Sequence, residues 1–307
     1  MKGFFTTVLI LFCISNLNAF SDSLENYQHS LSKKFLDTKL PKLEDFSKSY
    51  LSELSNSRAI FYPFGGPDVL YPITLFPNSE TFTIVGLEKT NSGLECLSQV
   101  EHRELDKQLG SLLKRSFFVT VDMSHAISGK CGILPILMTQ INMLGGKIIK
   151  IKNSDLDFGS MIKIQFNHMG KEKKVIYFKS NLMNSNLKDS FLDYIKLHHL
   201  VDISMIKASS FSMHNKEFSN IRDFIIKESN IILQDDTGIP IRYLKGFHLK
   251  LFGSYIHPYG KEWVNYKQTD LVELYKIAHQ SYNINFCYGY GCGKITPAII
   301  LAIKKLD

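Results

Sequence analysis

The chain has 307 residues, of which 44% are hydrophobic, 12% aromatic and 21% charged, and its formal net charge at pH 7 is +7. The apolar content excludes an intrinsically disordered chain, and the length suits one large domain or two small ones. The sequence has no internal repeat of about 20–50 residues, which excludes solenoids and propellers. It also lacks the P-loop, dinucleotide-binding, zinc-protease, Cys-x-x-Cys and nucleophile-elbow motifs, so no standard motif specifies a reaction.

An apolar run near the N-terminus predicts an export signal. Residues 4–14 are almost entirely apolar, a polar stretch follows, and Ala19 suits the last position before a cleavage site. The run is too short for a membrane span of about 20 residues. We expect a signal peptide at residues 1–19, a mature domain over residues 20–307 and a periplasmic or extracellular location. An uncleaved anchor and a lipoprotein attached at Cys13 remain alternatives.

The positive charge does not predict a nucleic-acid partner. The lysines are scattered, and their densest cluster lies within residues 171–174, beside a glycine turn typical of a solvated hairpin tip. An exported protein also rarely meets nucleic acid. The charge therefore supports only a weak attraction to anionic surfaces.

Four cysteines follow the predicted signal: Cys96, Cys131, Cys287 and Cys292. An even number in an exported chain permits disulfides. The last two flank a short segment that contains glycine, so we predict a Cys287–Cys292 bridge. A bridge between the other two cysteines, or buried free thiols, are the alternatives. A zinc site would need more closely spaced ligands.

Helical and extended patterns alternate along the first half of the chain. In chain order they predict a helix over 43–54, strands over 58–62 and 81–87, a helix over 105–113, a strand over 117–121, a helix over 134–144, a strand over 148–151, and a hairpin of 161–166 with 174–178.

The second half continues with a helix over 187–195, a strand over 203–206, a helix over 218–225, strands over 231–233 and 247–251, and a helix over 270–277. Residues 299–303 suit either a strand or a helix. Helices that alternate with strands predict an α/β fold: a mixed, mainly parallel sheet with helices on its faces and an inserted β-hairpin. No linker divides the mature chain, so we expect a single domain.

Three loops that carry carboxylates each follow a predicted buried strand. They hold Asp68, then Asp122 with His125, and finally Asp235 with Asp236. Ligands of open α/β sheets bind beyond the carboxyl ends of the strands, so parallel strands would gather these side chains at one edge. We therefore take Asp68, His125, Asp235 and Asp236 as candidate catalytic residues. The same set suits a divalent cation, although no motif specifies the ion.

Each of these residues also has a structural interpretation that needs no catalytic role. Asp68 follows Gly-Pro and suits a turn in which its carboxylate accepts backbone N–H groups. Residues 235–238 also read as a turn, with Asp ordering the backbone before Gly238. His125 is one of ten histidines, and a lone histidine is more often structural than catalytic.

Aromatic residues are the second candidate for a site, because many lie in loops rich in proline or glycine. Exposed aromatic rings beside carboxylates and amides suit a glycan or a peptide. The alternative is that they only pack together at a loop-rich edge. The set is Tyr62, Phe64, Tyr71, Tyr255, Tyr259, Trp263 and Tyr266.

Several stretches together resemble a family of uncharacterised bacterial exported proteins. They are Phe-Tyr-Pro-Phe-Gly-Gly-Pro-Asp at 61–68, Lys-Ala-Ser-Ser at 207–210, Gln-Asp-Asp-Thr-Gly-Ile-Pro at 234–240 and Phe-Gly-Ser-Tyr at 252–255. The resemblance spans roughly residues 58–302 and implies kinship without an activity. It favours Asp68, Asp235 and Asp236 as site residues, because these loops carry the family-like motifs.

Three functions remain open from the sequence. The first is a hydrolase or transferase that uses two carboxylates, with or without a divalent cation. The second is a non-catalytic periplasmic module that binds a glycan or a peptide. The third is an envelope interaction protein. A small-molecule, glycan or peptide ligand fits the first two, and none of the three needs a stable membrane span after signal cleavage.

Overall fold

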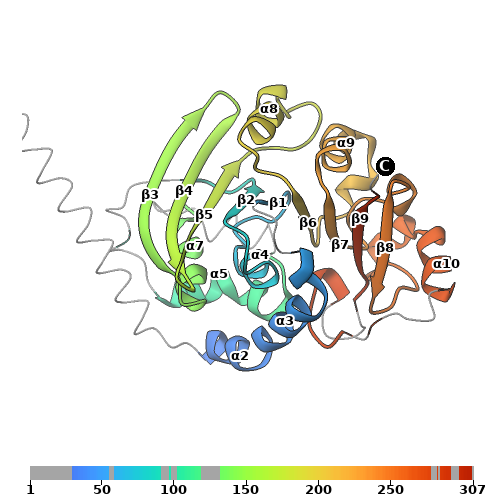
Figure 1. The fold of residues 1–307 in the computed structure, drawn as a ribbon, viewed down its shortest axis with the longest axis horizontal. Coiled ribbons are helices and arrows are strands. Elements are labelled where there is room, and N and C mark those ends of the chain that lie inside the picture. Colours follow the sequence, from blue (N-terminus) through green and yellow to red (C-terminus); the bar gives the residue numbers. More distant parts are fainter. Residues whose placement is uncertain are drawn as a thin grey trace, which may run out of the picture.

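The computed structural model describes residues 30–54, 59–90, 97, 102–118, 132–277, 282, 284–291 and 297–305. Within these residues nine strands form one sheet in the order β3-β4-β5-β2-β1-β6-β7-β9-β8, which runs from left to right in Figure 1. The strands are β1 Ala59–Tyr62, β2 Thr81–Gly86, β3 Lys147–Leu156, β4 Gly159–His168, β5 Lys171–Lys179, β6 Ile203–Ile206, β7 Ile231–Asp235, β8 Phe247–Phe252 and β9 Ile299–Lys304.

Helices connect the strands. The α-helices are α2 Ser30–Thr38, α3 Leu40–Phe46, α4 Leu70–Leu75, α5 His102–Arg115, α7 Leu134–Met143, α8 Asp189–Leu197, α9 Ser219–Glu228 and α10 Thr269–Ile277. Both α3 and α7 begin with proline in their first turn, where its missing N–H leaves no hydrogen bond unmade.

The centre of the sheet is parallel and its two ends are antiparallel. Strands β5, β2, β1, β6 and β7 run in the same direction. At one end β3, β4 and β5 form an antiparallel meander, and at the other β9 lies antiparallel between β7 and β8. This architecture confirms the expected fold class: a mixed, mainly parallel sheet with an inserted hairpin.

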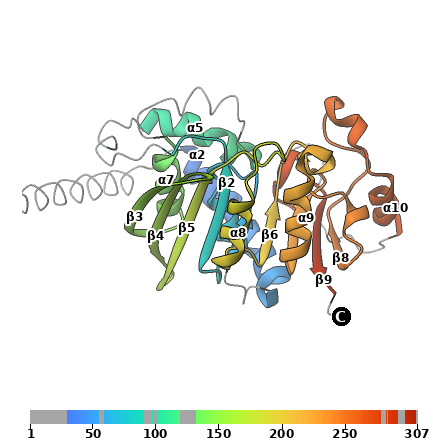
Figure 2. The same cartoon turned by 90° about the horizontal axis from the view of Figure 1, so that it is seen from above.

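Helices cover both faces of the sheet, which explains why the central strands are almost wholly apolar. One core lies between the sheet and α2, α3, α4, α5 and α7. The other lies between the opposite face and helices α8 and α9, which stand in front of the sheet in Figure 2. Helix α10 packs on a smaller cluster beside β8 and β9.

The structure differs from the sequence expectations at several elements. The helix expected over 43–54 leaves α-geometry after Phe46 and continues as one π-turn and one 3₁₀-turn. Residues 299–303, which were ambiguous, lie in strand β9. Helix α4 was not expected, because its sequence is apolar except for Thr74 and is buried on every side, so it shows no helical periodicity.

Some expectations concern residues outside the described part of the chain. They are the signal peptide at residues 1–19, the loop with Asp122 and His125, and the cysteines Cys96, Cys131 and Cys292. The Cys287–Cys292 bridge and export therefore stay predictions. Among the described residues, none of the helices has the length and apolar character of a membrane span.

Candidate functional site

The connections of the sheet change direction between β1 and β6. From β1 the chain passes through α4 to β2 on one side, whereas from β5 it passes through α8 to β6 on the other side of β1. Helices α4 and α8 lie on opposite faces of the sheet. The loops after β1 and β6 therefore diverge at the carboxyl edge, and this is where open α/β sheets bind ligands.

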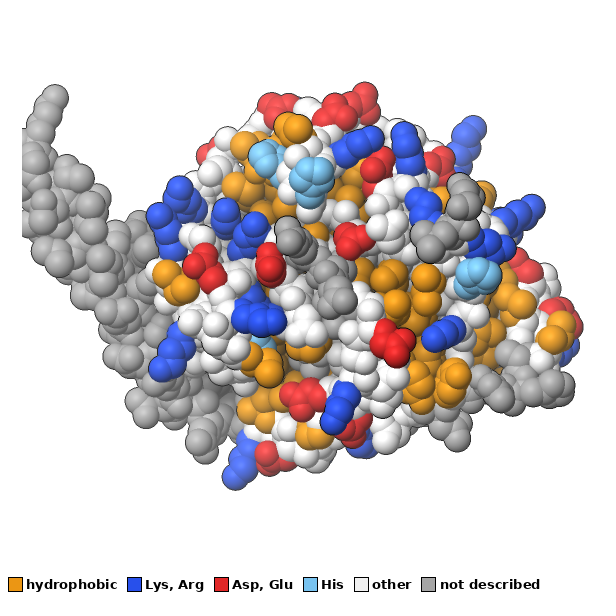
Figure 3. Space-filling view, viewed as in Figure 1, with side chains coloured by type: hydrophobic (Ala, Val, Ile, Leu, Met, Phe, Trp, Pro, Cys, Tyr) orange, Lys and Arg blue, Asp and Glu red, His pale blue; other side chains and the backbone are white. Residues whose placement is uncertain are grey.

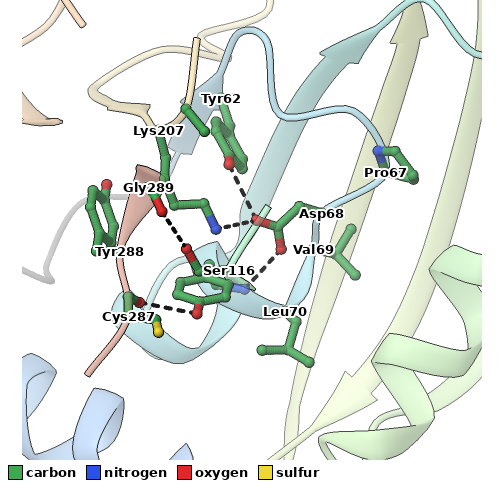
Figure 4. Close-up of polar contacts among 12 residues, drawn as sticks. Tyr62, Pro67, Asp68, Val69, Leu70, Ser116, Lys207, Cys287, Tyr288 and Gly289 are labelled. Atoms are coloured by element: carbon green, nitrogen blue, oxygen red, sulfur yellow. Dashed lines mark hydrogen bonds and ion pairs between the residues drawn. The ribbon is translucent and has the colours of Figure 1, made fainter. Parts of the chain in front are cut away.

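A buried ion pair joins these two loops. The Lys207 ammonium, directly after β6, lies 2.7 Å from Oδ2 of Asp68 in the loop after β1, as Figure 4 shows. Both side chains are at most 1% exposed. The Tyr62 hydroxyl donates to the same oxygen at 3.2 Å, and the backbone N–H of Tyr71 donates to Oδ1 at 3.2 Å. Asp68 thus fixes both loops at the switch in strand order.

Aromatic rings enclose the Lys207 ammonium. It lies 3.2 Å from the centre of the Tyr71 ring and 5.9 Å from that of Tyr288, within the range of cation–π attraction. Burial lowers the pKa of Lys207 to about 8, although the charges of Asp68 and Asp235 oppose this shift. Burial and the Asp68 charge raise the pKa of Tyr62, which keeps its hydroxyl protonated as a donor.

Asp235, at the end of β7, organises the loop after β6. Its Oδ2 accepts the backbone N–H of Ala208 at 2.8 Å, and its Oδ1 accepts the N–H of Thr237 at 3.0 Å and the Thr237 hydroxyl at 2.5 Å. Burial nevertheless raises the pKa of Asp235 to about 6, because these hydrogen bonds offset only part of the desolvation. The carboxylate therefore acts as the organiser of a turn, as the structural alternative expected.

The loop after β6 is held in an unusual conformation. Ala208, Ser210 and Phe211 all have positive φ angles, between 51° and 56°, and Phe64 in the loop after β1 has a φ of 62°. Ser209, between them, is tied to Thr237 through its N–H and its hydroxyl. Left-handed conformations are costly for residues with side chains and cluster at functional sites.

A cavity of about 620 Å³ opens over these loops at the carboxyl edge. It takes residues from the ends of β1, β2, β5 and β6, together with the loop before α10. Its volume lies within the usual range for small-molecule sites, about 300–1,000 Å³. The aromatic residues of its described lining are Tyr62, Phe64, Phe117, Phe118, Phe218, Tyr259, Trp263 and Tyr290.

The charges of Asp68 and Asp235 both act on the Lys207 ammonium and favour its protonated form. Neither carboxylate lines the cavity. The residues beside them that do line it are Tyr62 and residues 207–210. Asp236 is half-buried, and burial together with the Asp235 charge raises its pKa. His125 lies outside the described residues.

Lys207 was not among the site residues predicted from the sequence. The signal was present, because Lys207 directly follows the apolar run of β6, just as the carboxylates follow β1 and β7. A cation at such a place is buried only if an anion pairs with it, so the same rule that selected Asp68 predicts its partner.

The aromatic set of the sequence divides into two groups. Tyr62, Phe64, Tyr259 and Trp263 line the cavity. The other three have structural contacts: Tyr71 covers Lys207, Tyr255 packs in the small cluster with α10, and Tyr266 stacks on Phe211 at 4.9 Å between ring centres. Phe117, Phe118, Phe218 and Tyr290 complete the lining and were not expected.

No three His, Cys, Asp or Glu side chains of the described residues lie close enough together to hold a metal ion. A divalent cation therefore remains a prediction from the sequence. The carboxylates that line the cavity are Glu88 and Glu262. Glu88 accepts a hydrogen bond of 2.7 Å from the Tyr177 hydroxyl.

His214, in the 3₁₀ turn Ser212–His214 after the strained loop, predicts that the protein loses stability in acid. Burial, with the nearby Arg242 charge, lowers the pKa of His214 to about 4, and its ring packs edge-on against Phe211 and Tyr266. The unfolded chain, with a histidine pKa of about 6.5, binds the proton more readily. Stability is therefore lost as the pH falls from about 6.5 to 4, by about 3 kcal/mol.

The measurement is urea unfolding of the wild type and of His214→Gln between pH 7 and pH 4. We expect the variant to lose less stability over this interval, because its side chain does not titrate. Asp235 and Asp236 contribute equally to the pH dependence of stability in both proteins, so their contributions cancel when the wild type is compared with the variant. Equal pH dependence of the two proteins would show that His214 is not responsible.

Comparison with protein-family models, curated proteins and solved structures finds no match. The function is therefore inferred from the geometry and chemistry of the cavity.

Proposed function

We propose that this protein is a non-catalytic glycan-binding protein whose ligand occupies the cavity over the switch in strand order. The main support for this proposal is the aromatic lining of the cavity. Seven aromatic side chains of the lining are partly exposed to the cavity: Phe64, Phe117, Phe118, Phe218, Tyr259, Trp263 and Tyr290. Rings of this kind offer flat apolar faces, and the apolar face of a sugar stacks on such surfaces.

The polar part of the lining favours a ligand rich in hydrogen-bond donors. Glu88 and Glu262 present carboxylates, which accept hydrogen bonds and repel anions. Lys207 also borders the cavity, but its ammonium is neutralised by Asp68 and its side chain is 0% exposed. The charge offered to a ligand by the described residues is therefore negative. Sugar hydroxyls suit such a lining, whereas phosphorylated or acidic ligands do not.

The positions of the predicted catalytic carboxylates support binding over catalysis. Asp235 accepts three hydrogen bonds, and Asp68 has an ion pair and two hydrogen bonds. A carboxylate that acts as acid, base or nucleophile must reach the substrate. Since neither faces the cavity, their role in this proposal is to hold the two loops in their strained conformation.

A rigid lining also fits the proposal energetically. The positive-φ residues Phe64, Ala208 and Ser210 border the cavity, and the hydrogen bonds of Asp235 and Thr237 keep their loops in place. The Tyr290 hydroxyl lies 2.7 Å from that of Ser210, so the aromatic wall is tied to the same loop. A site fixed before the ligand arrives loses little entropy on binding.

Tryptophan fluorescence tests the proposal directly, because Trp263 is the only tryptophan of the chain and lines the cavity. Titration with neutral trisaccharides (maltotriose, cellotriose and chitotriose) should give a saturable change for at least one of them. The acidic trisaccharide of galacturonate should give none, because it meets Glu88 and Glu262. Tyr259→Ala should weaken binding at least about tenfold, the loss of about 1.4 kcal/mol expected for one aromatic contact.

Tyr243→Ala is the matched control, since Tyr243 is 38% exposed and packs on Arg222 and Arg242 away from the lining residues. It should bind as tightly as the wild type. Fluorescence that does not respond to any of the neutral trisaccharides, or that responds equally to the acidic one, contradicts the proposed function.

A further inference from the structure

The strands β3, β4 and β5 carry lysines on the face of the sheet that α8 and α9 cover elsewhere. Register places Lys150 beside Gln165 and Gln165 beside Lys174, and in the next row Lys152 beside Lys163 and Lys163 beside Ile176. Paired residues point to the same side of a sheet. Because Ile176 packs in the core with α8 and α9, the four lysines share that side. We call Lys150, Lys152, Lys163 and Lys174 the lysine face.

The charges of the lysine face are not compensated by the described residues. None of the four lysines forms an ion pair or hydrogen bond through its ammonium with any residue that the structure describes. Glu172, in the adjoining row, accepts a hydrogen bond from Gln165. Lys152 and Lys163 lie directly opposite each other on antiparallel strands, where like charges destabilise the pairing. The fold thus retains a repulsion that a single substitution would remove.

Exposed apolar side chains accompany these charges. Ile149, in the β-bulge of the edge strand β3, is 55% exposed, and Met169, in the turn between β4 and β5, is 77% exposed. The exposed Lys147 and Lys171 lie near them, at the same end of the meander. In Figure 3 basic side chains, in blue, are scattered over the whole visible face, including the left part, which β3–β5 occupy.

We propose that the lysine face docks the protein on the surface of an anionic lipid bilayer. Basic side chains near such a surface each contribute to binding, and adjacent apolar side chains enter the headgroup region. An extended partner suits this array, because the four charges spread over three strands and two rows on one side of the sheet. A single phosphate would contact only part of this array. The exposed Ile149 and Met169 favour a lipid surface over a soluble polyanion.

Vesicle co-sedimentation of the full chain tests the proposal. The quantity to compare is binding to vesicles of phosphatidylcholine alone and to vesicles with an equal share of phosphatidylglycerol. The apolar run at residues 4–14 would act on both kinds of vesicle alike, so the difference isolates the charge-dependent part. We expect more binding to the anionic vesicles than to the neutral ones, and loss of this excess in high salt.

The variant Lys150→Glu/Lys152→Glu should lower binding to anionic vesicles at least about tenfold, since it reverses two charges of the face. Its melting temperature should not fall, because the carboxylate introduced at position 152 would face Lys163 across the strand pair. The matched control is Lys245→Glu/Lys250→Glu, which changes the net charge equally at the opposite edge of the sheet, in and beside β8. The control should retain most of the binding.

Equal losses in the two double variants would overturn the proposal, because net charge alone would then explain the binding. Equal binding to both kinds of vesicle would overturn it as well. Retention of the wild type on soluble polyphosphate without binding to anionic vesicles would assign the lysine face to a soluble polyanion instead.

Discussion

Lys207→Met should lower the free energy of unfolding by about 3–5 kcal/mol, because it leaves Asp68 as an unpaired charge inside the protein. The Asp68 carboxylate is 1% exposed and faces the Lys207 ammonium at 2.7 Å. After the substitution only the Tyr62 hydroxyl and the Tyr71 N–H remain to stabilise its charge. Asp68→Asn should cost less, since a buried lysine can lose its proton, and burial already lowers the pKa of Lys207 to about 8.

Urea unfolding at pH 7 measures both effects. The double variant Asp68→Asn/Lys207→Met should be more stable than Lys207→Met alone, because no unpaired charge remains. Lys276→Met is the matched control: its partner Glu273 lies at 2.8 Å, but both side chains are at least 60% exposed. An exposed pair contributes about 0–1 kcal/mol. If the two lysine variants lose equal stability, the buried pair does not have the role assigned to it.

Gly289→Ala should also be strongly destabilising, by about 3 kcal/mol or more, for two independent reasons. Gly289 has a φ of +66°, in the left-handed region that costs other residues about 1–2 kcal/mol. A β-carbon there would also overlap the Asp235 carboxylate, which the Ala208 and Thr237 N–H groups hold in place. The clash adds to the backbone cost because Asp235 has no room to retreat.

Gly170→Ala separates the two contributions. Gly170 has a similar φ of +75°, but a β-carbon there would meet no atom within 4 Å. Its substitution should therefore cost only the backbone term, about 1–2 kcal/mol. Thermal or urea unfolding of both variants gives the difference. A Gly289 variant no less stable than the Gly170 variant would mean that Asp235 moves freely and does not hold the loop.

Patterns that depend on local periodicity were predictable from the sequence. The hairpin of β4 and β5 was expected from two apolar alternating runs around Met169 and Gly170, and short buried strands such as β6 were expected from apolar runs between polar ends. Helix α4 was not predicted, because a helix buried on all sides has no amphipathic pattern in its sequence. The end of α3 at Phe46 was not predicted, because the helical spacing of apolar residues continues through the π-turn that follows.

The candidate site was predictable only in part, because it depends on which strands are neighbours. The rule that loops gather at the carboxyl edge drew attention to the ends of β1 and β7, which run parallel in the sheet. It did not reveal that β6 lies between them, and so it missed Lys207. It also could not show that the carboxylates face inward while Glu88 and Trp263 face the cavity. Side-chain direction at a strand end depends on the turn that follows, which periodicity does not encode.

The order of the strands also has a consequence for how the protein folds. Ile60 in β1 pairs with Ile203 in β6, and Thr81 in β2 pairs with Lys174 in β5, so the sheet closes only through contacts between distant parts of the chain. Such contacts form slowly, whereas a hairpin such as β4–β5 forms early from neighbouring residues. The antiparallel meander that bears the lysine face can therefore assemble before β1 and β6 meet. A partly folded chain would then expose the lysine face before the cavity at the carboxyl edge exists.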